Sequence, residues 1–234
     1  MYGAYSFPAT IETENILISV EREEKRFLYR REFQEEKVEK ILAADSGQLT
    51  INPVEPLNKP VEVTSFMQIE FENSIVVEPK THQKIYLTFP IEIGVFVTSK
   101  RDVEVLDVLT LVRQKYTLYG EPSNGVICRY WKSGVYSEIP ETDRLREGVM
   151  ELTINNEVGE WVEVNKAVFN AVGMKIYYND MVSMRATMEL GSKTVAETDF
   201  RDSPLKSGMK KSIELYTARK VPIVGRKMIM GWGL

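Results

Sequence analysis

Residues 115–131 read KYTLYGEPSNGVICRYW and lie at the midpoint of a chain of 234 residues. The segment consists of two strand-like runs, rich in aromatic and basic side chains, around a Pro-Ser-Asn-Gly turn at residues 122–125. A turn of this composition between apolar runs is typical of a β-hairpin or of a crossover between domains. We therefore expect a boundary between two β-rich halves near residue 120.

Strand signals dominate on both sides of this segment. Short apolar runs with alternating polar residues, such as residues 85–97 and 182–190, are separated by Gly, Pro, Asn and Asp. Many short strands joined by such turns are typical of β-sandwiches and barrels. The sequence thus predicts an all-β fold with few or no helices. We expect two β-sandwich-like domains in tandem, residues 1–119 and 120–234.

Helical periodicity is rare in this chain. Residues 35–44 are the best helix candidate, because Val38, Ile41 and Leu42 repeat at i, i+3 and i+4. Residues 102–112 are ambiguous, although their β-branched side chains favour a strand.

The two halves also resemble each other locally. MQIEFEN at residues 67–73 and MELTINN at residues 150–156 both alternate apolar with polar residues and end in Asn. Either the halves arose by duplication, or strand–turn–strand segments simply look alike, and the sequence leaves both explanations open.

The composition is that of an ordinary globular protein, with 43% apolar and 27% charged residues and a net charge of −4. A single cysteine excludes an intrachain disulfide. The N-terminal residues show no signal-peptide pattern, and no apolar run approaches the roughly 18 residues that a membrane-spanning helix needs. We expect a cytoplasmic protein.

Charge is unevenly distributed along the chain. Residues 201–234 contain eight Lys or Arg and two acids, which leaves about −10 on the first 200 residues. This basic segment predicts pairing with an acidic surface of the same chain or of a second copy, and it makes nucleic-acid binding unlikely. We expect a protein partner or self-association in preference to a small molecule. The residues that we assign to the segment are Lys206, Lys210, Lys211, Arg219 and Lys220.

Nucleophilic catalysis has little support in the sequence. The only histidine, His82, lies in a polar stretch expected to be a turn, and the only cysteine, Cys128, is expected to be a buried strand residue. No phosphate-binding loop, dinucleotide-binding glycine pattern or Gly-x-Ser-x-Gly motif is present. We expect no cofactor and no catalytic residue.

A zinc site of the usual kind is excluded, because one cysteine and one histidine cannot supply its ligands. Glu197 and Asp199 share one face of an expected strand and are weak candidates for a Ca²⁺ or Mg²⁺ site. Arg201 lies on the same face and would neutralise them, so the sequence favours a solvated charged strand and no bound metal.

The central segment is the best candidate for a ligand or partner surface. Lys115, Tyr119, Arg129 and Trp131 would line a groove at the domain junction, and Tyr, Trp and Arg dominate binding hot spots. The alternative is an ordinary domain interface with Tyr119 and Trp131 as its core.

Residues 221–234 are basic, apolar and strand-like. They are expected to form a last strand on their own domain, rather than to bind a membrane or another chain's sheet edge.

Several short motifs support a family assignment. The chain begins with Met1-Tyr2-Gly3, contains LYGEPSNG at residues 118–125 followed by Arg129-Tyr130, and ends in a Gly-Trp-Gly motif at residues 231–233. In these motifs it resembles an archaeal family classed as a domain of unknown function. The resemblance spans the whole chain and implies no activity and no catalytic residue.

The sequence therefore favours a non-catalytic binding or assembly protein that acts through β-sandwich surfaces and the domain junction. The alternative is a carboxylate-dependent hydrolase of a carbohydrate or phosphate ester, because 34 acidic residues offer many carboxylate pairs. Aromatic stacking platforms for a sugar would come from Tyr130, Trp131, Tyr136 and Trp161.

Overall fold

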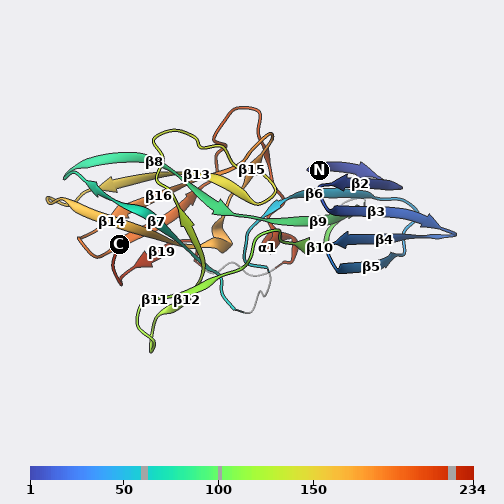
Figure 1. Ribbon diagram of the computed structural model, residues 1–234, viewed down its shortest axis with the longest axis horizontal. Coiled ribbons are helices and arrows are strands. Elements are labelled where there is room, and N and C mark those ends of the chain that lie inside the picture. The colour runs from blue at the N-terminus through green and yellow to red at the C-terminus, as the bar shows by residue number, and fades with distance from the viewer. Residues whose placement is uncertain (59–62, 100–101, 221–224) are drawn as a thin grey trace. The chain divides into compact units, whose positions relative to one another are not determined.

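The computed structural model describes residues 1–58, 63–99, 102–220 and 225–234 (Figure 1). Nearly all of its regular structure is β, which confirms the predicted fold class. Helical structure in these residues is limited to the 3₁₀ turn η1 (Ala171–Gly173) and the single-turn helix α1 (Leu215–Ala218). None of the described helices has the length and apolar character needed to cross a membrane.

Contacts between residues divide the chain into two compact units. Unit 1 contains residues 1–52 and 94–108, and unit 2 contains residues 53–93 and 109–234. The chain therefore enters unit 2, returns to unit 1 and enters unit 2 again. The boundary expected between residues 119 and 120 lies inside unit 2.

Unit 1 is built on two four-stranded sheets. One sheet has the order β1-β6-β9-β10 and the other is the antiparallel meander β2-β3-β4-β5. The strands of the first sheet are β1 (Gly3–Ser6), β6 (Gln48–Val54), β9 (Glu92–Ser99) and β10 (Asp102–Leu109). Those of the meander are β2 (Ala9–Thr13), β3 (Ile16–Glu23), β4 (Arg26–Phe33) and β5 (Glu36–Leu42).

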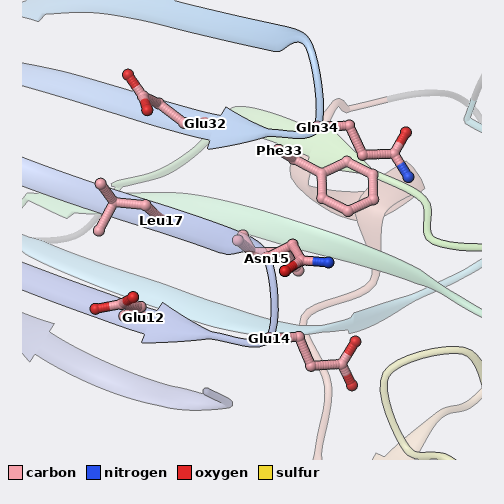
Figure 2. A pocket seen from close by; sticks show the side chains of 8 residues that line it. Glu12, Glu14, Asn15, Leu17, Glu32, Phe33 and Gln34 are labelled. Atoms are coloured by element: carbon pink, nitrogen blue, oxygen red, sulfur yellow. The ribbon is translucent and has the colours of Figure 1, made fainter.

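The meander is folded by three two-residue turns spaced regularly along the sequence. Their first residues, Glu14, Glu24 and Gln34, adopt left-handed φ values of 47°, 52° and 53°. Two of these turns lie at the same end of the sheet, where they border a surface hollow of about 380 Å³ (Figure 2). Glu12, Glu14 and Glu32 line this hollow together with Phe33, so part of the acidic charge of the first 200 residues gathers at this end.

Residues 36–42 form the edge strand β5 and not the helix predicted from their periodicity. The charges of β5 match those of its neighbour β4. Arg30 Nε donates to Glu39 Oε1 at 2.9 Å, and Lys37 Nζ to Glu32 Oε1 at 2.9 Å. Pairing with β4 thus overrides the helical propensity of a Glu/Lys-rich segment. The ambiguous residues 102–109 form strand β10.

A buried charged pair links the two sheets of unit 1. Arg31 on β4 is 1% exposed, and its Nε lies 2.6 Å from Asp107 Oδ2 on β10. Tyr29 donates its hydroxyl proton to the same oxygen at 3.0 Å. Burial, followed by the negative charge of Asp107, raises the pKa of Tyr29 far above its ordinary value. Asp107 therefore provides the hydrogen-bond acceptor for both Arg31 and Tyr29, inside an apolar core that includes Ile18 and Val20.

Unit 2 contains two sheets of mixed direction. The first has the order β11-β12-β7-β14, and the second has β18-β15-β16-β13-β8 with β17 between β16 and β19. The first is formed by β11 (Tyr116–Tyr119), β12 (Val126–Ser133), β7 (Phe66–Val77) and β14 (Val162–Asn170). The second is formed by β8 (Thr81–Pro90), β13 (Glu147–Asn156), β15 (Tyr177–Tyr178), β16 (Val182–Leu190), β17 (Ala196–Arg201), β18 (Lys210–Lys211) and β19 (Met228–Met230).

Both sheets of unit 2 combine strands from before and after residue 120. β12 pairs in parallel with β7, and β13 pairs antiparallel with β8 along its whole length. These long-range pairings place the expected domain boundary inside unit 2. The sequence of a hairpin turn does not show whether its strands also pair with strands from earlier in the chain. The similar segments 67–73 and 150–156 lie in β7 and β13, in different sheets of the same unit.

The C-terminal strand β19 pairs antiparallel with β17 and is therefore part of unit 2, as expected of a last strand. Met228 and Met230 are buried, whereas Ile229 between them is exposed. Residues 221–224, which belong to the same predicted strand-like stretch, lie outside the described residues.

Candidate binding site

The central segment forms a hairpin of β11 and β12 within unit 2 (Figure 1). Its loop closes tightly: Asn124 N and Gly125 N both donate to Glu121 O, at 3.2 and 2.7 Å. A Cβ on Gly125 would lie 2.7 Å from two backbone oxygens, and Gly120 has a φ of 104°. Both positions therefore require glycine. The Gly-x-Pro-x-x-Gly motif is the local cause of the hairpin.

One face of the hairpin packs against the C-terminal residues. Tyr119 is buried and contacts Trp232 edge-on, with ring centroids 5.5 Å apart. Its hydroxyl donates to Gly233 O at 3.0 Å and accepts from Trp232 N at 3.1 Å. Cys128 lies on the same side and is completely buried, and this burial raises the pKa of its thiol to about 12. The cysteine is thus a packing residue, as predicted.

Replacing Tyr119 by phenylalanine is expected to lower the free energy of unfolding by about 1–2 kcal/mol, because the partly buried backbone groups Trp232 N and Gly233 O lose their partner. Urea denaturation measures this loss. Tyr136→Phe is the matched control, since Tyr136 is 39% exposed and its replacement should change stability little. Equal stability of Tyr119→Phe and the unmodified protein would show that the hydroxyl does not anchor the C-terminus.

The other face of the hairpin is open. Tyr116, Leu118 and Ile127 are 38%, 42% and 49% exposed, and Leu118 lies opposite Ile127 in the strand register. Alternation along a strand places Tyr116 and Leu118 on one face and Thr117 and Tyr119 on the other. The hairpin therefore presents an apolar patch that was not among the residues predicted from the sequence.

A cavity of about 320 Å³ opens where the hairpin begins. Three exposed cations line it, together with two half-buried aromatic rings and a valine. No salt bridge of these cations is present in the part of the chain that the structure describes. The lining residues are Val112, Arg113, Lys115, Tyr130, Trp131 and Lys132. We call this hollow the basic–aromatic pocket.

Residues of strands β8 and β7 hold the aromatic side chains of the basic–aromatic pocket in place. Trp131 Nε1 donates to Thr88 Oγ1 at 2.9 Å, and Thr88 N donates to Ser133 Oγ at 2.7 Å. Tyr130 forms a hydrogen bond with Glu70, and its pKa is raised by burial and then by the Glu70 charge. The rings are therefore fixed before any ligand arrives, which lowers the entropic cost of binding.

A buried polar cluster adjoins the hairpin. Glu92 is fully buried, and it accepts from Asn58 N at 3.1 Å and from Gln114 Nε2 at 3.3 Å. Burial raises the pKa of Glu92 to about 7, although the hydrogen bonds from Asn58 and the charge of Arg129 oppose this change. Arg129 is 1% exposed, and burial lowers its pKa. Its Nε has no hydrogen-bond partner among the described residues.

A second buried carboxyl belongs to the same cluster. Glu55 Oε2 accepts from Leu215 N at 3.1 Å, and the Glu55 carbonyl accepts from the Asn58 side chain. Asn58 Oδ1 in turn accepts from Arg219 at 3.3 Å. Burial raises the pKa of Glu55 to about 7 as well. The cluster thus combines two buried carboxyls with pKa values near neutrality.

The structure separates the four residues predicted to form one surface. Lys115 and Trp131 line the basic–aromatic pocket, whereas Tyr119 and Arg129 are buried away from solvent. Arg129 contacts the ring of Tyr116, with its guanidinium 5.9 Å from the centroid. Strict strand alternation from Lys115 would have identified the exposed patch, because it places Tyr116 and Leu118 together.

The predicted basic segment is partly neutralised within unit 2. Lys211 pairs with Asp202 at 2.7 Å and with Glu214 at 3.2 Å. Arg219 bonds to Asn58, and Lys206, Lys210 and Lys220 are exposed. Asp202 and Glu214 are the two acids of residues 201–234 themselves. These pairs therefore leave open the predicted pairing of the segment with the acidic remainder of the chain or with a second copy.

The weak metal candidates have other partners. Glu197 forms a salt bridge with Lys227, and Asp199 Oδ1 accepts from Phe200 N at 2.8 Å. The described residues contain no group of three or more His, Cys, Asp or Glu that could hold a metal ion.

The only histidine, His82, lies in strand β8 and not in the turn expected from its polar neighbours, and its side chain is exposed.

Comparison with known proteins identifies the family of the chain. No curated protein and no solved structure matches the chain. Residues 1–231 match the family described as "Protein of unknown function (DUF432)". This range includes all of unit 1, the hairpin, and unit 2 as far as residue 231. The chain therefore belongs to this family of proteins of unknown function.

Proposed function

We propose that the protein is a non-catalytic binding or assembly protein, and that the basic–aromatic pocket receives an acidic segment of a protein partner. One observation carries the proposal: three exposed cations without a salt bridge in the described residues surround two fixed aromatic rings in a cavity of about 320 Å³. Carboxylates of a partner would pair with the cations, and an apolar or aromatic side chain would pack on Trp131.

A labelled Glu-Glu-Tyr-Glu-Glu peptide tests this proposal by fluorescence anisotropy. The double variant Arg113→Glu with Lys132→Glu is expected to weaken binding at least about tenfold, because it reverses two of the three charges. Lys206→Glu with Lys210→Glu changes the net charge equally at exposed positions elsewhere. This matched control should change binding by less than about threefold.

Two outcomes would contradict the proposal. Equal weakening by both double variants would show that the peptide responds only to the net charge. Absence of peptide binding to the unmodified protein at low salt would show that the pocket does not receive acidic segments.

A carboxylate-dependent hydrolase of a carbohydrate or phosphate ester is the second candidate. The carboxyls of Glu55 and Glu92 have pKa values of about 7, which would suit a general acid or base, but both side chains are buried away from solvent. Trp161 and Tyr136, two of the suggested stacking platforms, are exposed. Turnover of generic glycoside or phosphoester substrates, with or without Mg²⁺, that disappears in Glu92→Gln would support this candidate. Turnover unchanged by Glu55→Gln and Glu92→Gln would exclude these carboxyls as its source.

A further inference from the structure

Among the residues that the structure describes, strand β11 is an edge strand, and the backbone groups of Leu118 at its centre have no partner there. It stands at the end of the sheet order β11-β12-β7-β14. Tyr130 N donates to Lys115 O, which makes Lys115 and Tyr130 a hydrogen-bonded pair of the antiparallel ladder. Because such pairs alternate with non-bonded pairs, the N–H and C=O of Leu118 point away from β12. An edge of this kind is a template for another strand.

The side chains around Leu118 are suited to antiparallel pairing of β11 with β11 of a second copy of the chain. Leu118 is 42% exposed and has apolar neighbours on its face. Lys115 lies three residues before it and Glu121 three residues after it. Both charged side chains are exposed, and neither forms a salt bridge in the described ranges. The charge pattern of this segment is therefore self-complementary about Leu118.

We propose that β11 is a self-association surface, at which two copies of this chain pair antiparallel, edge to edge, about a two-fold axis at Leu118. Each Leu118 N–H donates to the Leu118 carbonyl of the other copy. Lys115 of one copy then faces Glu121 of the other, and the symmetry repeats this contact. Because β11 spans Tyr116–Tyr119, Lys115 and Glu121 lie just outside the paired residues, and the proposed contact is made by their side chains.

The second copy is the favoured occupant because the complementary charges lie on the same strand. An unrelated acidic strand would satisfy Lys115 but would be repelled by Glu121. This inference refines the assembly role within the proposed function. It does not depend on ligand binding in the basic–aromatic pocket.

Sedimentation equilibrium over a wide range of protein concentration tests the pairing. The unmodified protein is expected to approach twice the mass of one chain as its concentration rises. Leu118→Pro removes an N–H that points outward and is therefore expected to give a monomer whose melting temperature is nearly unchanged. Thr117→Pro is the control, because its N–H points at β12 and its loss should lower the melting temperature.

Charge reversal gives a sharper test. Lys115→Glu and Glu121→Lys are each expected to raise the dissociation constant of the dimer at least about tenfold. The two variants mixed together should form a hybrid dimer, because every facing pair is then of opposite charge. The double variant carrying both reversals should dimerise as the unmodified protein does.

A protein that stays monomeric at every concentration would overturn the inference. Dimers that persist in Leu118→Pro, or single-reversal variants that fail to dimerise when mixed, would also overturn it. These results are separate from those of the peptide experiment. Peptide binding by a monomer would refute only the β11 dimer, and a dimer without peptide binding would refute only the proposed pocket function.

Discussion

Replacing Asp107 by alanine is expected to lower the free energy of unfolding of unit 1 by about 3–5 kcal/mol, because it leaves the buried charge of Arg31 without its main partner. The Tyr29 hydroxyl loses its acceptor in the same variant. Arg31 retains a contact with Glu36 at 3.2 Å, but the Glu36 side chain is 67% exposed. Water therefore screens the remaining pair and limits its compensation.

Glu36→Ala is the matched control for this prediction. It removes the other carboxylate that contacts Arg31, yet it should cost less than about 1 kcal/mol because that carboxylate is exposed. Thermal and urea unfolding, followed by circular dichroism, measure both variants. Similar losses in Asp107→Ala and Glu36→Ala would mean that the buried pair does not hold the two sheets of unit 1 together.

Replacing Glu92 or Glu55 by glutamine is expected to stabilise the protein above neutral pH. In the folded state burial raises the pKa of each carboxyl from the ordinary value of 4.5 to about 7. Ionising either side chain inside unit 2 therefore opposes folding. Glutamine keeps the shape of the side chain and remains neutral at every pH, so it avoids this cost.

The sign of the pH dependence follows from the raised pKa. Below pH 4.5 both states are protonated and the carboxyls add no pH dependence. Between pH 4.5 and about 7 the folded state binds more protons, so stability falls as the pH rises. Since one pKa unit corresponds to about 1.4 kcal/mol, the loss is on the order of 3 kcal/mol for each carboxyl. Above about pH 7 this loss of stability no longer changes with pH.

Unfolding by urea at several pH values between 4 and 9 tests this expectation. Each glutamine variant should have the same free energy of unfolding as the unmodified protein near pH 4 and a larger one at pH 8. Between these values its free energy of unfolding should fall less steeply with pH. Glu138→Gln, which changes an exposed side chain of unit 2, should leave stability unchanged. A Glu92→Gln variant that is less stable at pH 8 would show that the ionised carboxylate, paired with Arg129, stabilises the fold.

Local sequence patterns predicted the strands and the central hairpin well. Alternating apolar residues identified β3, β8 and β16, and the Gly-x-Pro-x-x-Gly motif identified the turn between β11 and β12. These features depend on neighbouring residues, because side-chain alternation and glycine φ values are local properties. Residues 35–44 were wrongly predicted as a helix. Their Glu and Lys side chains fit either structure, and the cross-strand pairs with β4 decide for the strand.

The sequence by itself determined that this chain is all-β, that Cys128 is a buried strand residue, and that a hairpin lies at its centre. Only the tertiary structure decided which strands share a sheet, because the paired residues of β12 and β7, such as Cys128 and Phe66, are 62 positions apart in the sequence. That pairing places the hairpin within unit 2 and separates Lys115 and Trp131 from Tyr119 and Arg129. It also leaves β11 at a sheet edge. The edge position of β11 and the burial of Tyr119 and Arg129 arise from contacts between distant segments, and local patterns do not encode them.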